Sequence, residues 1–277
     1  MVISNVPRIE KAYAKLNLYL DVLRLRDDNY HDIIGLFQTI NLCDLISFEK
    51  LPANEGIKVI CDVPISGRNT VEKAFYVFCE NIERVDFGLR VTIFKRIPIG
   101  AGLGGGSSDA AATLRYLAVE TGHSFDEVFN IAHLVGSDVP FLIFGGTAVV
   151  TKKGESVHFL EPLQNYEVKL ISPPGVRIST KEAYSKLTRS DFAKGPGTPY
   201  ELYRAYRKRD FSAIRKLSYN VFQEKITDTY PAVAEALALM KRKKPIVHMM
   251  TGTGSTVFSV FDRKADYSFV TGFFRDL

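Results

Sequence analysis

The sequence has little of what several protein classes require. Its three cysteines, Cys43, Cys61 and Cys79, are odd in number and widely spaced, which argues against a disulfide framework and a zinc cluster. No stretch approaches 18 consecutive apolar residues, so we expect no membrane span. The first residues lack the charged-then-apolar layout of a signal peptide, and we therefore expect a cytoplasmic protein.

The chain also has no large excess of charge of one sign. Lys and Arg number 36 against 31 Asp and Glu, a formal net charge of +5, and the basic residues are densest at 204–209 and 241–244. Such runs occur in nucleic-acid-binding proteins, but they are more common on a solvated helix face or at a helix C-terminus. We expect no nucleic-acid partner, and the basic balance suits a polyanionic small molecule equally well.

Length and patterning predict a two-domain α+β protein. The 277 residues, 46% hydrophobic and 24% charged, are enough for domains with sizeable cores. We place an N-terminal domain at 1–155 and a C-terminal domain at 156–277. The apolar periodicities and capping residues predict strands at 8–25, 33–40, 44–49, 57–61, 89–96, 147–152, 168–172, 247–250 and 256–261, and helices at 70–82, 107–121, 125–134, 181–187, 200–207, 211–216 and 232–242.

The glycine-rich segment 98–112, Pro-Ile-Gly-Ala-Gly-Leu-Gly-Gly-Gly-Ser-Ser-Asp-Ala-Ala-Ala, is the most informative part of the chain. Five of the seven residues from Gly100 to Gly106 are glycine, so few side chains keep the backbone N–H groups away from a ligand. The serines and alanines that follow indicate a helix start, with unpaired N–H donors and a partial positive charge. These features predict a nucleotide phosphate site. The alternative is a turn that needs glycine for packing alone.

The two commonest nucleotide-binding motifs do not account for this loop. Gly100, Gly102 and Gly105 spell G-x-G-x-x-G, but that fingerprint requires an acidic residue at the end of a second strand about 20 residues on. Glu120 lies at that distance, at the end of the predicted helix 107–121. The Walker pattern is excluded because the chain contains no Gly-Lys dipeptide.

Three further segments fit a kinase, and each also has an ordinary structural explanation. Lys15 and Asn17 share one face of the first predicted strand, as the kinase interpretation requires. In the alternative interpretation, that face is an ordinary solvated surface. Asp138, ahead of an apolar run, fits a base that orients a hydroxyl, or a helix cap. The turn at 250–256, rich in glycine and hydroxyls, is either a plain hairpin or an element that shapes the phosphate loop from its other side.

These segments in this order resemble the GHMP kinases, the superfamily of galacto-, homoserine, mevalonate and phosphomevalonate kinases. The match runs through the glycine loop, the strand of Lys15, the segment Asp28-Asn29-Tyr30-His31, the segment 136–140 and the turn 251–258. It covers most of the chain and is weakest between 190 and 244. The resemblance implies a ribosomal protein S5 domain 2-like N-terminal half that binds ATP and a ferredoxin-like C-terminal half that binds substrate.

The segment at Tyr30 and His31, with 136–140, is most similar to one branch of this superfamily. That branch uses ATP and Mg²⁺ to phosphorylate the 2-hydroxyl of a cytidine-diphosphate-linked methylerythritol, giving the 2-phosphate and ADP in isoprenoid precursor synthesis. The alternatives are another GHMP kinase acting on mevalonate, homoserine or a sugar, a nucleotide-binding module without turnover, and an RNA binder. The sequence leaves the oligomeric state open.

The resemblance also implies roles for particular residues. Lys15 and Asp138 take the catalytic places, and Asn17 holds the polyol of the substrate. Tyr30 stacks on the cytosine ring, His31 bonds its edge, and Tyr184 lies on its other face. The expected ATP-binding residues are Pro98, Ile99, Gly100, Ala101, Gly102, Leu103, Gly104, Gly105, Gly106, Ser107 and Ser108, with Asn69 and Lys95 near the adenine. The metal ligands are not specified, and Ser107 and Ser108 are candidates.

Two departures from the family pattern bear on these roles. Asn29 replaces the glycine that usually precedes the Tyr-His pair, and we expect the turn to survive because Asn tolerates a positive φ. Thr251 and Thr253 stand where the closing turn usually has serines, which preserves the hydroxyls.

Overall fold

The computed structural model describes residues 7–64 and 69–262, which form two compact units. The first unit contains residues up to 14, 42–97 and 104–143, and the second contains 15–41, 98–103 and the residues from 144 on. Two long strands, β1 (Arg8–Leu25) and β2 (His31–Pro52), contribute residues to both units. The units therefore interleave along the chain, and the boundary at 155/156 stays a prediction.

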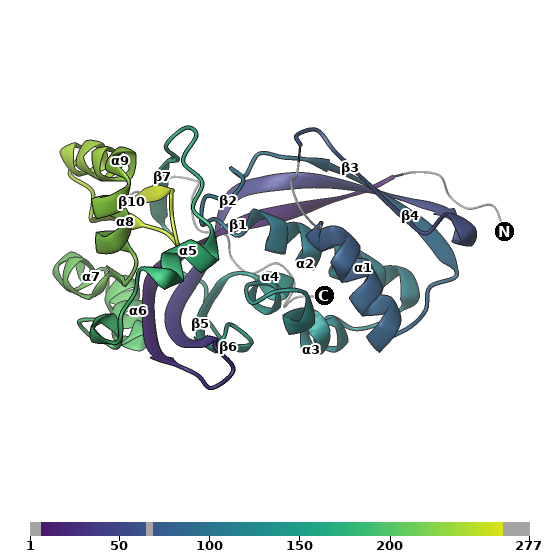
Figure 1. Ribbon diagram of the computed structural model, residues 1–277, viewed down its shortest axis with the longest axis horizontal. Coiled ribbons are helices and arrows are strands. Elements are labelled where there is room, and N and C mark those ends of the chain that lie inside the picture. Colours follow the sequence, from purple (N-terminus) through teal and green to yellow (C-terminus); the bar gives the residue numbers. More distant parts are fainter. Residues whose placement is uncertain (1–6, 65–68, 263–277) are drawn as a thin grey trace. The chain divides into compact units, whose positions relative to one another are not determined.

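In the first unit, helices pack beside three neighbouring strands of a larger sheet. Strand β4 (Phe87–Phe94) pairs antiparallel with β2 and parallel with β3 (Ile57–Cys61), and the short 3-10 helix η1 (Ala53–Glu55) follows β2. Helices α1 (Thr70–Asn81), α2 (Gly105–Thr121) and α3 (Phe125–Val135) pack against one another (Figure 1). The stacked rings of Phe48 and Tyr116, 4.2 Å apart between centroids, join the sheet to α2.

Helix α2 is buried over most of its length. Its residues from Ser108 to Ala118 are all buried, because its alanines allow close approach of neighbouring elements. Arg115 is buried with them and donates to the carbonyls of Leu142 and Lys11. Because the helix is packed along its length, its N-terminal turn, where the glycine loop ends, is held in place.

The second unit contains strands of two sheets. Strand β5 (Thr147–Lys152) pairs antiparallel with β2 and with β6 (Ser156–Leu160), and the two-residue β8 (Tyr219–Asn220) pairs parallel with β1. The other sheet is antiparallel, in the order β7 (Tyr166–Ile171), β10 (Val257–Asp262), β9 (Val247–Met250). The remaining elements are α5 (Thr180–Ser185), η2 (Arg189–Asp191), α6 (Pro199–Lys208), α7 (Phe211–Leu217), α8 (Gln223–Thr229) and α9 (Pro231–Arg242).

The α+β class is confirmed, and most predicted elements are present with shifted ends. The strands expected at 33–40 and 44–49 are one strand, β2. Gly136 and Pro140 predict a break in the chain at 136–140, but this segment leads directly into helix α4 (Val139–Phe144), because proline is tolerated in a first helical turn. β6, β8 and α8 were not predicted. Pro64 and Gly67 predict a turn at 64–67, of which only Pro64 lies among the described residues.

Candidate active site

The glycine loop leads into α2 without a side-chain cap. Gly104, the N-cap residue, is left-handed with φ 73°, and α2 begins at Gly105, two residues earlier than the serines suggested. Left-handed backbone favours glycine, and the absence of a capping side chain leaves the first N–H groups of the helix available to an anion. The local backbone thus has the features of a phosphate site.

The turn between β9 and β10 packs on the first half of the loop, which favours the second of the two interpretations given for it above. Gly102 has φ 80°, and a Cβ there would overlap the carbonyl oxygen of Thr251. The Thr256 N–H donates to the Ala101 carbonyl at 3.2 Å. Because glycine is the residue that fits between these backbones, the turn 251–254 fixes the course of residues 101–103.

Lys15 and Asn17 do share one face of β1, but they do not form a solvated surface. They are 4% and 1% exposed, and Lys15 Nζ donates to Asn17 Oδ1 at 2.8 Å. Apolar residues alternate along this strand, which predicts one buried and one solvated face. That prediction is wrong here, since β1 is buried on both faces along this stretch. The Lys15 N–H also donates to the carbonyl of Leu103 in the glycine loop at 3.0 Å.

The side-chain amide of Asn17 is only partly hydrogen-bonded within the described residues. The backbone N–H of Asn17 donates to Thr251 Oγ1 at 3.0 Å, and its side-chain Oδ1 accepts a hydrogen bond from the Lys15 ammonium. Its Nδ2 is buried and has no hydrogen-bond partner among the described residues. Buried polar atoms are rarely left without a partner in native proteins, so this donor is suited to a ligand oxygen.

Asn220, which no sequence motif singles out, supports the turn 251–254 by hydrogen bonds. Its buried Nδ2 donates to the carbonyls of Met250 at 2.8 Å and Gly252 at 2.9 Å. The neighbouring Gln223 accepts from the Met250 N–H at 2.9 Å. Hydrogen bonds therefore lead from Asn220 through the turn to Asn17 and on to Lys15. A lone asparagine outside any motif gives no sequence signal for this role.

Lys95 and Asn69 have contacts other than those expected. Lys95 lies between two buried carboxylates, with Nζ 2.5 Å from Asp44 and 2.8 Å from Asp109. Asn69 caps α1 by accepting from the Val71 N–H. Their proximity to an adenine stays a prediction, while the contacts that the structure shows for both are structural.

The Lys95 cluster connects the two ends of the glycine loop. Asp44 accepts from the N–H groups of Arg96 and Ile97, immediately before Pro98, and Asp109 lies in the first turns of α2. Burial raises the pKa of Asp109 to about 7, with Lys95 opposing the rise and Asp44 adding to it. Burial lowers the pKa of Lys95, but the two carboxylates together outweigh burial and raise this pKa above its ordinary value. The three groups together anchor both ends of the loop.

An aromatic cluster surrounds two of the predicted cytosine-binding residues. The rings of His31 and Tyr184 lie 4.7 Å apart, and Phe192 meets His31 edge-on at 5.6 Å. Burial lowers the pKa of His31, so its imidazole is neutral at pH 7 and offers one donor and one acceptor. Tyr30 is 59% exposed, with Lys153 Nζ 4.8 Å from its ring centre. Asn29 has φ 61°, as expected of that turn.

The remaining candidates lie at the N-terminal ends of α4 and α2. Asp138 is half-buried, and its carbonyl accepts the first bond of α4 from Leu142. Ser108 is buried and donates to the Tyr13 carbonyl, whereas Ser107 is half-buried. Asp138 and Lys15 belong to different compact units, and their cooperation stays a prediction.

Two findings on the described residues bear on cofactors and location. No group of three or more His, Cys, Asp or Glu among them could hold a metal ion. Within the same residues, no helix has the length and apolar character needed to cross a membrane. The cytoplasmic location and the absence of a nucleic-acid partner stay predictions.

Comparison with known families confirms the resemblance seen in the motifs. The GHMP kinases N terminal domain matches residues 69–146, and the GHMP kinases C terminal domain matches residues 202–274. The chain belongs to the GHMP kinases.

Within that family the similarity is to one kinase in particular. The 4-diphosphocytidyl-2-C-methyl-D-erythritol kinase of Pseudothermotoga lettingae is 48% identical over 277 residues, the full length of both chains. The enzyme of that name from Thermotoga maritima is 47% identical over 94% of this chain and 95% of its own. A crystal structure of 4-(cytidine 5'-diphospho)-2C-methyl-D-erythritol kinase is similar with a TM-score of 0.75 and 29% identity, covering 91% of this chain and 90% of that one. A homoserine kinase from Cytophaga hutchinsonii, 16% identical with a TM-score of 0.71 over 95% and 87%, shares the fold.

Proposed function

We infer that this chain transfers the γ-phosphoryl group of ATP to the 2-hydroxyl of 4-diphosphocytidyl-2-C-methyl-D-erythritol, in isoprenoid precursor synthesis. The observation that carries the inference is full-length identity of 48% to a kinase of that name, together with an uncapped helix N-terminus behind a glycine loop. Phosphoryl transfer depends mostly on positioning and on stabilising charge, and the features described above supply both.

Residues 98–108 bind the phosphates of ATP through backbone N–H groups and the positive end of α2. The turn 251–254 and the Lys95 cluster keep this loop in its binding conformation before ATP arrives. Mg²⁺, when bound with ATP, neutralises phosphate charge and needs only one or two protein oxygens. The half-buried Ser107 hydroxyl fits that role better than Ser108, whose hydroxyl donates to Tyr13.

Lys15 and Asn17 act on the transferred group and the acceptor. The Lys15 ammonium offsets charge that develops on the phosphoryl oxygens. Asn17, with its unsatisfied Nδ2, donates to a hydroxyl of the methylerythritol unit. The hydrogen bond from Lys15 to Asn17 fixes both side chains in one geometry, so that the acceptor is held beside the ammonium.

Asp138 accepts or orients the proton of the 2-hydroxyl during transfer. Replacement Asp138→Asn keeps the shape of the side chain and removes the charged acceptor. We expect kcat to fall by about two to four orders of magnitude, the scale of general-base catalysis, with the affinity for ATP little changed. Turnover near the normal rate in this variant would remove Asp138 from the proposal.

The cytidine is recognised by the segment at Tyr30 and His31 together with Tyr184. Neutral His31 donates to or accepts from the edge of the base, and the tyrosine rings supply stacking surface. The turn carrying Tyr30 is exposed, whereas His31 is fixed by its aromatic neighbours. Specificity for a cytidylyl substrate rests on this group.

The test is a product assay with a substrate panel. The purified chain is incubated with ATP, Mg²⁺ and the cytidylyl substrate, and in parallel with mevalonate, homoserine or galactose in its place. The molecular masses of the products are then measured by mass spectrometry. We expect a gain of one phosphoryl group on the cytidylyl substrate with release of ADP. Phosphorylation of another acceptor instead would reassign the substrate, and no transfer to any acceptor would overturn the kinase assignment.

A further inference from the structure

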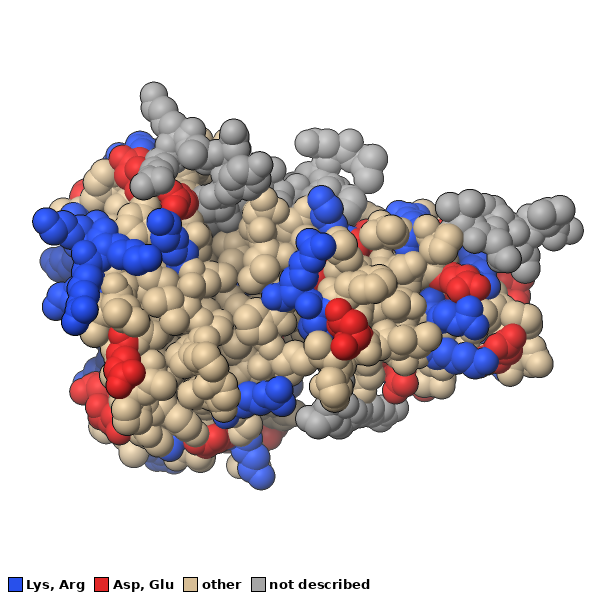
Figure 2. All heavy atoms as spheres, turned by 90° about the horizontal axis from the view of Figure 1, so that it is seen from above, with Lys and Arg blue, Asp and Glu red and all other residues tan. Residues whose placement is uncertain are grey.

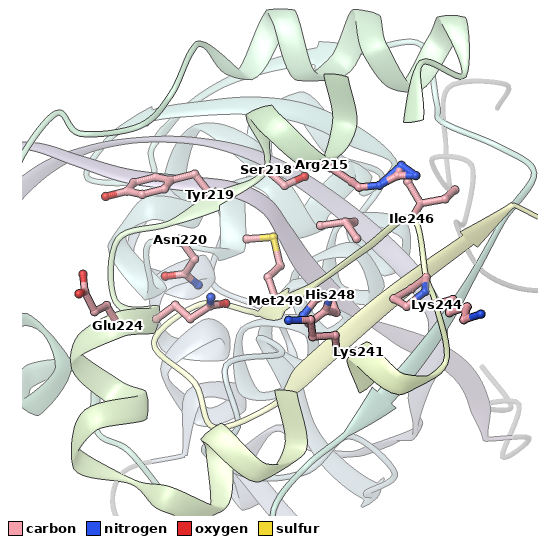
Figure 3. Close-up of a pocket in the computed structure, with 13 residues that line it drawn as sticks. Arg215, Ser218, Tyr219, Asn220, Glu224, Lys241, Lys244, Ile246, His248 and Met249 are labelled. Atoms are coloured by element: carbon pink, nitrogen blue, oxygen red, sulfur yellow. The ribbon is translucent and has the colours of Figure 1, made fainter. Parts of the chain in front are cut away.

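The second unit contains a cavity of about 410 Å³ whose lining includes none of the residues assigned above to ATP or substrate. Its lining comes from the segments 215–224 and 241–249, which include the ends of α7 and α9 and the strands β8 and β9 (Figure 3). The floor carries buried apolar side chains, Ile246, Val247 and Met249. Pockets that hold small molecules have this size and this mixture of an apolar wall with a few polar groups.

Cationic side chains from separate elements line the same cavity. Arg215 comes from α7, Lys241 from the last turn of α9 and Lys244 from the segment before β9. None of the three is paired with a carboxylate within residues 7–64 and 69–262. Glu224 is the acidic residue of the lining, and in Figure 3 it lies on the left, away from Arg215 and Lys244 on the right. The cavity therefore has a cationic end.

The lining also explains the spacing within the basic run 241–244. Lys241 and Lys244 line the cavity, whereas the intervening Arg242 and Lys243 do not. Figure 2 shows Lys and Arg gathered over the part of the second unit where α9 lies in Figure 1. A helix C-terminus favours cations in general, but that effect does not select two positions three residues apart to face a common cavity.

The floor of the cavity is joined to the proposed active site by hydrogen bonds. Asn220 lines the cavity and holds the Met250 and Gly252 carbonyls, and Gln223, also in the lining, holds the Met250 N–H. The turn that follows bears the Thr251 hydroxyl that holds Asn17. Because Met249 lines the same floor and directly precedes Met250, a molecule that shifts this floor acts on the turn that supports the glycine loop.

We propose that this cavity is a second ligand site, which takes a small organic phosphate and adjusts the turn 251–254. The phosphate lies among Arg215, Lys241 and Lys244, and a compact apolar body lies against Ile246 and Met249. Guanidinium and ammonium groups bind phosphate by charge-assisted hydrogen bonds. The site differs from the ATP site, which uses the glycine loop.

The four methionines of the chain provide the readout. Met249 lines the cavity, and the Met250 side chain packs on Gly254 in the turn, so their methyl groups report on the site and the turn separately. The probe is inorganic pyrophosphate, titrated into protein that carries ¹³C-methyl methionine and whose glycine loop is saturated with a non-hydrolysable ATP analogue. The titration is followed by NMR, with the signals assigned by Met249→Leu and Met250→Leu. We expect the Met249 methyl to shift in a saturable way, with the Met250 methyl following the same curve.

A matched pair of variants separates this site from every other basic surface. Lys241→Gln with Lys244→Gln removes two charges that line the cavity, and Arg242→Gln with Lys243→Gln removes two charges from the same run that do not. We expect the first pair to weaken pyrophosphate binding at Met249 at least tenfold and the second pair to leave it within twofold. Equal losses in the two pairs, or no saturable shift of Met249 in the native chain, would overturn the site. A Met250 shift that persists after the first pair of substitutions would overturn its link to the turn. Neither readout depends on kinase turnover.

Discussion

Two buried lysines, Lys15 in the second unit and Lys95 in the first, have different surroundings. Lys15 donates to the neutral amide of Asn17 and lies 5.1 Å from the centre of the Phe37 ring. Lys95 lies between the carboxylates of Asp44 and Asp109. Both side chains are nearly inaccessible, so burial and residue type alone do not distinguish a catalytic lysine from a structural one.

The difference lies in the further contacts made by the partner of each lysine. Asn17 carries a buried amide donor with no partner among the described residues, which suits a ligand. Asp44 binds the backbone at Arg96 and Ile97, which suits an anchor for the loop. We conclude that the Lys15 pair acts in chemistry, whereas the Lys95 cluster acts in positioning.

The largest expected effect is on stability, from Lys95→Met. Removing one partner of a buried ion pair leaves uncompensated buried charge and costs about 3–5 kcal/mol of unfolding free energy. The measurement is urea unfolding at pH 7, with Lys58→Met as control, since Lys58 pairs with Glu55 on an exposed surface. We expect less than about 1 kcal/mol for the control. An equally small loss for Lys95→Met would show that the cluster does not anchor the loop.

Lys15→Met should instead act on turnover. Loss of one group that stabilises transition-state charge lowers kcat by about 10²–10³, or ~3–4 kcal/mol. We expect Lys95→Met, assayed at a temperature where it is folded by circular dichroism, to lower kcat less than tenfold. ADP release under saturating substrates measures both. Comparable losses of kcat in the two folded variants would erase the distinction between the lysines.

The sequence predicted the glycine loop and the turn 251–254 well because both depend on local chemistry. Glycine at tight backbone positions and Asn29 in a left-handed turn follow from steric rules that act within a few residues. The loop's helix began two residues earlier than expected because Gly104, rather than a serine, forms the cap. Local rules fix the class of a turn better than its end residue.

The contacts of Lys95 and Asn220 could not be read from the sequence. Lys95 meets Asp44, 51 residues away, and Asn220 meets carbonyls 30 and 32 residues away. Such pairs depend on which strands become neighbours, and no periodicity along the chain encodes that. The burial of Lys15 escaped prediction for the same reason, since β1 is covered by elements distant in sequence, β8 among them.

The third prediction concerns pH and the anchoring cluster. The pKa of Asp109 is about 7 in the folded chain because of burial, above the ordinary value of 3.8. Between pH 4 and 7 the folded state therefore holds more protons than the unfolded state, and this group's contribution to stability declines as pH rises through that window. We expect Asp109→Asn to remove that decline, a difference on the order of 2 kcal/mol between pH 5 and pH 8. Urea unfolding at both pH values tests it, and an identical pH dependence in the native chain and the variant would contradict the raised pKa.

The smallest expected effect is on substrate affinity, from Tyr30→Ala. Stacking of an aromatic ring on a base contributes about 0.5–1.5 kcal/mol beyond area burial, so KM for the cytidylyl substrate should rise about three- to tenfold while KM for ATP stays unchanged. The control is Tyr76→Ala on α1, which removes another exposed ring, 46% accessible against 59% for Tyr30. Because Tyr76 belongs to the first unit and to no predicted binding segment, neither KM should change in the control. If Tyr30→Ala raised both constants equally, the ring would support the turn rather than the cytosine, and selectivity would rest on His31 and Tyr184 alone.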